Sequence, residues 1–211
     1  MLIFFAALLA AITVHEFAHA FMAVRLGDPT PKLLGRLTFN PIAHLDPFGT
    51  LLPILLILTG SPIVFGWGKP VQFDPYNLEN PRRDSALISF AGPAANLLLA
   101  SLLSLILRLS SGPFSPFYFL SSVLPSFIVI NVVLATFNLI PVHPLDGGKI
   151  LIGLLPNKEA YKAERFLSQY GMIILLFLIF PILNGRSPVF IILSPLINLL
   201  LSVYLPSGFL V

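Results

Sequence analysis

Long apolar runs alternate with short polar segments along this chain. Four runs approach or exceed the roughly 20 residues that an apolar helix needs to cross a bilayer. They cover residues 1–26, 86–109, 117–140 and 189–205. A fifth run, 171–183, is shorter, but it can span if residues 166–170 join it. The pattern predicts an all-α polytopic membrane protein with about five to six transmembrane helices.

The region between the first two long runs reads differently. Residues 48–58 are apolar but too short to be assigned as a span from length alone. Glycine and proline then recur every few residues over 60–71, as in hairpin turns rather than in a helix. Such backbone is tolerated at membrane depth only where protein or a water-filled cavity covers it.

The basic residues favour a re-entrant path for residues 48–58. If this segment dips in and returns, ten of the twelve basic residues share one face, and only Arg108 and Arg186 lie opposite. If it spans, the basic residues at 25–36 and those at 69–83 fall on opposite sides, which the positive-inside rule disfavours. We therefore expect an external N-terminus and cytosolic basic loops, although the sequence leaves the spanning path open.

Composition supports a single membrane-embedded domain over residues 1–211. Charged residues make up 10% of the chain, against roughly 25% in soluble domains, and the mean hydropathy is +0.93. Cysteine is absent, which excludes disulfides and thiolate-bound metals. The net charge of +3 is too small and scattered to predict nucleic-acid binding. The expected partner outside the protein is the lipid bilayer.

The first apolar run contains the most informative motif, His15-Glu16-Phe17-Ala18-His19. Two histidines four residues apart project from one helix face and can bind one Zn²⁺, while the glutamate between them can handle the proton of a water. Polar groups inside a membrane span are costly, which favours a functional role over two histidines that neighbours merely satisfy. The first run is thus expected to be a retained helix rather than a signal peptide.

A catalytic zinc site needs a third protein ligand, and Asp146 is the best candidate in this chain. It follows the apolar run 117–140, where Pro141 and Pro144 end or bend the helix. On the predicted topology both runs enter the cytosolic side at their C-terminal ends, and His19 lies only about 9 Å in depth from Arg25. The two histidines and Asp146 are therefore expected at the same depth in the membrane. A turn or capping role for Asp146 is the competing interpretation.

Several motifs together resemble the site-2 protease family of intramembrane zinc metalloproteases. They are the motif at 15–19, the stretch 138–148 with its Leu-Asp-Gly core, and the segments 35–41, 44–47, 66–71, 80–83 and 90–96. The match covers roughly residues 10–155, in the family's order, and the helices at 166–205 follow it. The resemblance is to the compact bacterial and archaeal branch, without PDZ or CBS domains.

The resemblance implies one Zn²⁺ per chain, held by His15, His19 and Asp146, with Glu16 as the catalytic carboxylate. It also implies a small re-entrant β-hairpin, which matches residues 63–73. In the family the hairpin and the segment at Asn138 hold an unwound substrate as an extended strand, so Asn138 and Pro141 become candidate substrate-binding residues.

Three alternatives stay open beside these assignments. His143, where relatives often have an apolar residue or proline, is a second possible third ligand. Asn138 can equally cap or bridge helices. For Gly92 and Asn96, four residues apart, we expect close helix packing rather than a role in the site.

The expected function is therefore hydrolysis of peptide bonds in or near transmembrane segments of membrane proteins, as in regulated intramembrane proteolysis. The enzyme is expected to be a multi-pass protein of the cell membrane with its active site toward the cytosol. The alternative is a non-proteolytic metal or ion carrier, or a scaffold, that uses the same ligands. A carrier usually shows repeat symmetry, which the sequence lacks. The substrate and the oligomeric state are not readable from the sequence.

Overall fold

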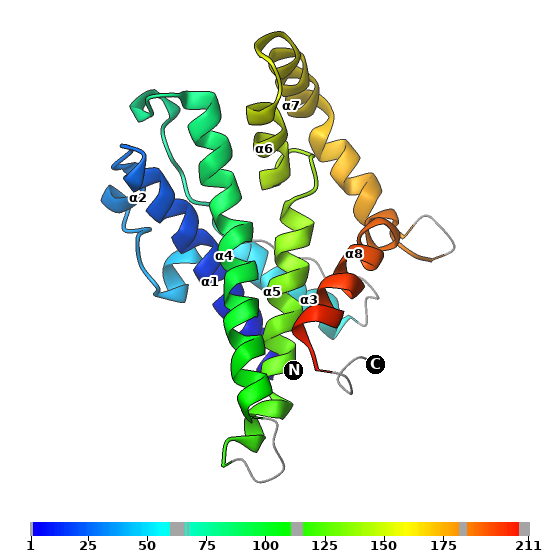
Figure 1. Ribbon diagram of the computed structural model, residues 1–211. Coiled ribbons are helices and arrows are strands. Elements are labelled where there is room, and N and C mark those ends of the chain that lie inside the picture. The colour runs from blue at the N-terminus through cyan, green and yellow to red at the C-terminus, as the bar shows by residue number, and fades with distance from the viewer. Residues whose placement is uncertain (1, 60–65, 67, 111–115, 182–184, 207–211) are drawn as a thin grey trace.

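The computed structural model describes residues 2–59, 66, 68–110, 116–181 and 185–206. Almost all of these residues that form regular structure are helical (Figure 1). The α-helices are α1 (Leu2–Arg25), α2 (Thr30–Leu33), α3 (Pro47–Leu58), α4 (Pro81–Ser110), α5 (Leu124–Asn138), α6 (Asp146–Leu154), α7 (Asn157–Ile179) and α8 (Pro188–Tyr204). Short 3-10 helices are η1 (Pro41–His44), η2 (Pro75–Asn77) and η3 (Tyr118–Ser122).

Two of the described helices are long and apolar enough to cross a membrane. They are α1, with 24 residues and a hydropathy of 1.7, and α4, with 30 residues and a hydropathy of 1.9. The helices α5 and α8 are apolar but shorter. The chain is thus a largely helical membrane protein, while the count of five to six spans stays a prediction.

The predicted helix over 117–140 is divided in the structure. Its first part is the 3-10 helix η3, and α5 begins only at Leu124. The reason is Pro125, which lies in the first turn of α5. Proline lacks an amide hydrogen and clashes with the preceding turn, so a regular helix starts at it more readily than it runs through it.

The first of the two C-terminal runs forms a longer helix than the hydropathy alone indicates, whereas α8 has the length of its run. The helix α7 joins the charged residues after Asn157 to the apolar run that ends at Ile179. The segment 166–170 is therefore helical, as the possible span required. The helix stops before Pro181, because a proline disfavours helical backbone in the residue preceding it.

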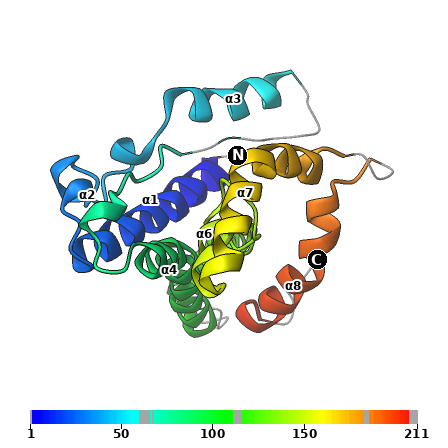
Figure 2. The same ribbon diagram turned by 90° about the horizontal axis from the view of Figure 1, so that it is seen from above.

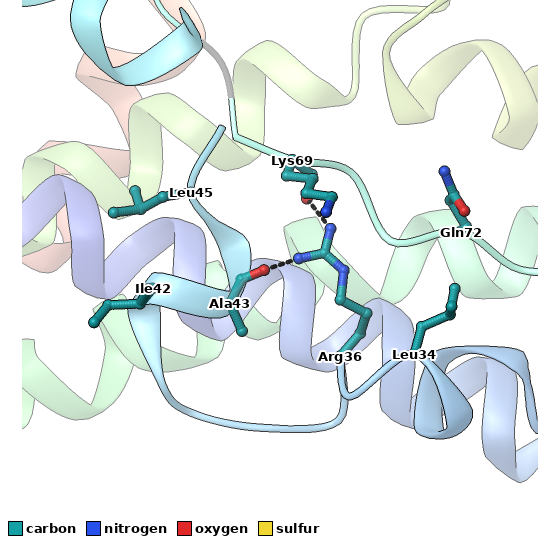
Figure 3. Close-up of a pocket in the computed structure, with 7 residues that line it drawn as sticks. All are labelled: Leu34, Arg36, Ile42, Ala43, Leu45, Lys69 and Gln72. Atoms are coloured by element: carbon teal, nitrogen blue, oxygen red, sulfur yellow. Dashed lines mark hydrogen bonds between the residues drawn. The ribbon is translucent and has the colours of Figure 1, made fainter. Parts of the chain in front are cut away.

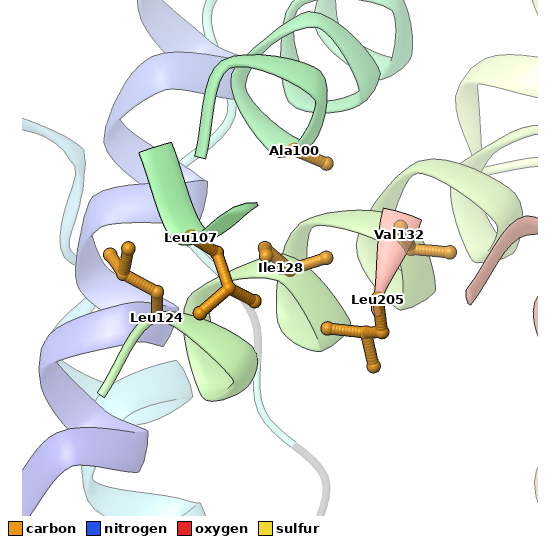
Figure 4. Packing of buried hydrophobic residues seen from close by; sticks show 6 residues of the cluster. All are labelled: Ala100, Leu107, Leu124, Ile128, Val132 and Leu205. Atoms are coloured by element: carbon orange, nitrogen blue, oxygen red, sulfur yellow. The ribbon is translucent and has the colours of Figure 1, made fainter. Parts of the chain in front are cut away.

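Helix α4 lies at the centre of the bundle and packs against α1, α5 and α6. Figure 4 shows the buried cluster between α4 and α5, where Leu107 and Ile128 are fully buried and Leu205 closes one side. Each side chain of this size that is fully buried contributes roughly 1.5–3 kcal/mol in a soluble protein. Seen from above, α3 lies at the edge of the molecule, apart from α4 and α5 (Figure 2).

One end of the bundle gathers α2, the start of α4, α6 and the start of α7 (Figure 1). These elements carry basic residues in their sequences, including Lys32, Arg82 and Lys158. The end of α4, which carries Arg108, lies at the opposite end with the start of α5 (Figure 1). The helices α4 and α5 thus run in opposite directions, and the membrane topology stays a prediction.

The predicted hairpin at 63–73 falls partly on residues 63–65 and 67, which lie outside the described residues. Gly68 forms an isolated antiparallel bridge with Leu45, and Lys69 donates a 2.8 Å backbone hydrogen bond to His44. Within the described ranges there is no strand, so the hairpin stays a prediction. Helix α3 has 12 residues and is about 18 Å long, less than a bilayer core, which is compatible with a re-entrant path.

Candidate metal centre

His15, His19 and Asp146 meet in the interior between α1 and α6. Their nearest ligand atoms all lie within 4.8 Å of one another. Oδ2 of Asp146 is 3.1 Å from Nε2 of His15 and 3.3 Å from Nε2 of His19. Two ligands of a tetrahedral zinc, each about 2.0–2.1 Å from the ion, are about 3.3 Å apart. The two separations from Asp146 and the donor types therefore fit a zinc ion.

Both imidazoles are oriented through their other nitrogen. Nδ1 of His15 is 2.6 Å from Oδ1 of Asn96 on α4, and Nδ1 of His19 is 2.7 Å from the carbonyl oxygen of Ile88 on the same helix. A carbonyl can only accept, so Nδ1 of His19 carries the hydrogen. In the neutral ring, Nε2 then carries the lone pair, and this nitrogen lies 3.3 Å from Oδ2 of Asp146. Second bonds of this kind are typical of metal-binding histidines.

The hydrogen bonds of Asn96 assign the tautomer of His15 as well. The amide nitrogen of Asn96 donates to the Ala11 carbonyl at 3.0 Å and to Oδ1 of Asn131 at 2.8 Å, which uses both of its hydrogens. Asn131 in turn donates to the carbonyl of Phe127. The oxygen of Asn96 is then the atom facing His15, so Nδ1 of His15 donates and Nε2 is free to bind a metal.

The site depends on two glycines where backbone approaches closely. A Cβ at Gly92 would lie 2.5 Å from Nε2 of His19 and 2.7 Å from Cε1 of His15. Gly92 thus packs closely, as expected, but its neighbours are the two imidazoles and Asn96 binds His15, so the expectation that these two residues have no role in the site is wrong. A Cβ at Gly147 would lie 2.2 Å from the carbonyl oxygen of Ile140, so this glycine lets the first turn of α6 carry Asp146 back toward α1.

Glu16 lies on α1 beside the cluster, and one of its oxygens is fixed by the backbone. Oε2 accepts a 2.8 Å hydrogen bond from the backbone N–H of Val71. Lys149, one turn after Asp146, lies with its ammonium 4.4 Å from the ring centre of Phe73. The segment around Val71 thus contacts Glu16 of α1 and Lys149 of α6.

The remaining candidates from the sequence lie outside the cluster. Asn138 ends α5 and its amide donates to the carbonyl of Leu134 in its own helix. Pro141 is exposed on the connection to α6. His143 is also exposed, its backbone lies against Gly171 of α7, and the metal-binding group found among the described residues does not include it.

Sequence reasoning did not assign Asn96, Ile88 or Val71 to the site. Asn96 carried a usable signal, since an amide inside an apolar span needs a partner. Ile88 and Val71 contribute backbone atoms, which no side-chain pattern reveals.

Apolar helices that bring two histidines, an aspartate and a neighbouring glutamate together are the arrangement expected of a membrane metalloprotease. The chain matches peptidase family M50 over residues 3–121 and 115–178 and belongs to this family, the site-2 protease family.

Two relatives illustrate the match. "Putative zinc metalloprotease YwhC" of Bacillus subtilis is 37% identical over 209 residues, which cover 92% of each chain. "Putative zinc metalloprotease Rip2" of Mycolicibacterium smegmatis is 35% identical over 178 residues, 83% of this chain and 66% of that protein. No solved structure shows a significant match.

Proposed function

We propose that this protein is an intramembrane zinc endopeptidase that cuts peptide bonds in or near transmembrane segments of other membrane proteins. The observation that carries the proposal is the convergence of His15, His19 and Asp146 beside Glu16, with both histidine Nδ1 atoms already engaged. Three protein ligands are the set typical of catalytic rather than structural zinc sites.

The three ligands would hold one zinc ion, which supplies Lewis-acid activation of a water and of the scissile carbonyl. Glu16 takes the proton of the attacking water and returns it to the leaving amine. Because Oε2 of Glu16 accepts the Val71 amide hydrogen, Oε1 would be the oxygen left for this proton transfer. Because Asn96 and Ile88 accept from Nδ1, Nε2 would be the nitrogen that binds the metal in the neutral form of each imidazole.

The substrate is a transmembrane segment that has locally unwound. A helical substrate hides its amides in i→i−4 hydrogen bonds, so the cut needs an extended stretch. The predicted hairpin at 63–73, with Asn138 and Pro141, would hold such a stretch by strand addition. The exposure of Pro141 supports this arrangement.

The protein is proposed to be multi-pass, with about five to six spans, and to open its site toward the cytosol. The support is the gathering of basic elements at the end of the bundle that holds α2, α6 and the start of α7 (Figure 1). Water then has a short path to a site that otherwise lies in lipid.

The test uses the full chain purified in detergent with a transmembrane reporter protein. Wild type should cleave the reporter, lose cleavage with a zinc chelator and regain it with added Zn²⁺. Glu16→Gln should abolish cleavage while it keeps zinc, and Glu79→Gln, an exposed carboxylate elsewhere, should cleave normally. Equal cleavage by wild type and Glu16→Gln would overturn the proposal, and zinc binding without any cleavage would favour the carrier.

A further inference from the structure

Arg36 is a buried cation whose guanidinium donates hydrogen bonds to backbone carbonyl oxygens. Its side chain lies in the interior at 5% exposure. It donates to the carbonyls of Ala43, Lys69 and Pro70, the last two at 2.8 and 3.0 Å. Among the described residues no carboxylate forms an ion pair with it. Figure 3 shows the guanidinium reaching between η1 and the segment at Lys69.

The segment that Arg36 holds is the one that holds Glu16. The Pro70 carbonyl and the Val71 N–H belong to a single peptide unit, which is planar and rigid. Arg36 binds the oxygen of this unit, and Glu16 binds its N–H at 2.8 Å. Fixing the oxygen therefore fixes the direction of the N–H that meets the carboxylate.

The connection from Arg36 to Ala43 gives this arrangement a rigid base. The main chain at Ala43 and His44 is part of η1, and the His44 carbonyl accepts from the backbone N–H of Lys69 at 2.8 Å. A guanidinium has five hydrogens in a fixed plane and can join two separate backbone segments at once, whereas an ammonium has a compact charge without this fork. The position therefore favours arginine over lysine.

We propose that Arg36 is a positioning residue for Glu16, which acts by orienting the peptide unit between Pro70 and Val71. The proposal rests on the proposed function, in which Glu16 handles the proton of the attacking water. Arg36 itself touches neither the metal ligands nor Glu16 in the described contacts. Its removal should lower the rate of the chemical step without weakening zinc binding.

The first test compares Arg36→Gln with Arg83→Gln, an exposed arginine at the same end of the bundle. With the full chain and a transmembrane reporter, Arg36→Gln should lower kcat by about 10–100-fold, because small displacements of a catalytic group have effects of this size. KM and bound zinc should stay at the wild-type values. A kcat equal to that of Arg83→Gln would overturn the proposal.

The second test asks whether Arg36 acts through Val71. Val71→Pro removes the amide hydrogen that Glu16 binds and leaves Arg36 in place. It should lower kcat about as much as Arg36→Gln, and the double variant should be no slower than the slower single variant. Losses that multiply in the double variant would show that Arg36 acts by another route.

The third test does not depend on catalysis. With isotope-labelled valine, hydrogen exchange of the Val71 amide should be at least about tenfold faster in Arg36→Lys than in wild type, because an opened hydrogen bond loses its protection. The amide of Val132, in the buried core, is the internal control. Unchanged exchange at Val71 would overturn the proposal. If wild type fails to cleave any reporter, the proposed function fails, but the exchange result still decides whether Arg36 holds this peptide unit.

Discussion

Oδ1 of Asn96 lies 2.6 Å from Nδ1 of His15, although the two residues are 81 positions apart in the sequence. Both side chains are buried, and the amide nitrogen of Asn96 is fully used by Ala11 and Asn131. The bond therefore has one possible polarity, with His15 donating. A residue of α4 thus decides which nitrogen of a helix α1 histidine can bind a metal.

Replacing Asn96 should weaken zinc binding. Leucine has a side-chain shape similar to that of asparagine. In Asn96→Leu, Nδ1 of His15 loses its hydrogen-bond acceptor, and the imidazole therefore loses its fixed orientation. We expect an affinity loss of about 10–100-fold, the range found for such outer partners of metal ligands. Competition with a coloured chelator measures it. Asn198→Leu, an exposed amide on α8, is the control, and equal zinc affinities in the two variants would contradict the prediction.

Enlarging Gly92 should disturb the site more than the helix. Alanine at a helical glycine position normally adds up to about 1 kcal/mol of stability. Here the new methyl group would lie 2.5 Å from Nε2 of His19, so crowding should instead cost about 1–3 kcal/mol. Thermal unfolding and zinc retention of Gly92→Ala measure the effect. A raised melting temperature with normal zinc binding would show that the space is not needed.

Asp28 should make the stability of the connection after α1 depend on pH. Burial alone would raise the pKa of Asp28, but hydrogen bonds from Thr30, Asn77 and Asp74 outweigh it and hold the pKa below its ordinary value. The charged form is therefore favoured in the folded state. Its contribution is complete above the unfolded pKa of about 3.9 and is lost as the pH falls through the lower folded value.

Comparison with Asp28→Asn checks this sign. The amide oxygen can replace only some of the contacts, so the variant should be about 1–3 kcal/mol less stable near neutral pH. The difference should be the same at pH values of about 5 and 7 and should shrink below about 4. Thermal unfolding across this range measures it, and a gap that widens toward acid would refute the assignment.

The absence of cysteine makes the membrane orientation directly testable. Tyr76 lies 95% exposed at the end that carries the basic elements, and Tyr118 lies 57% exposed beyond the opposite end of α4. A single cysteine at Tyr76 should react with an impermeant maleimide only from the cytosol, and one at Tyr118 only from outside. Labelling of both from the same side would invalidate the proposed topology.

Hydropathy and motif spacing determined a large part of this protein. The apolar runs placed α1 and α4, and the spacing of His15 and His19 put both on one helix face. The meeting of these histidines with Asp146 was predictable as well. The rise per residue of a helix is fixed, so counting residues along the two apolar runs places the histidines and Asp146 at the same depth. The start of α5 was not predictable from hydropathy. The average over 117–140 gives no weight to Pro125, the second residue of α5.

Only the tertiary structure decided which atoms surround the three ligands. Gly92 makes room for the imidazoles, Asn96 and the Ile88 carbonyl orient them, and the Val71 amide fixes Glu16. Helix formation and depth depend on local sequence, so a pattern in the chain can predict them. The rotation of α4 against α1 and the path of the backbone at Val71 depend on contacts between segments far apart, and those are set by packing of the whole bundle.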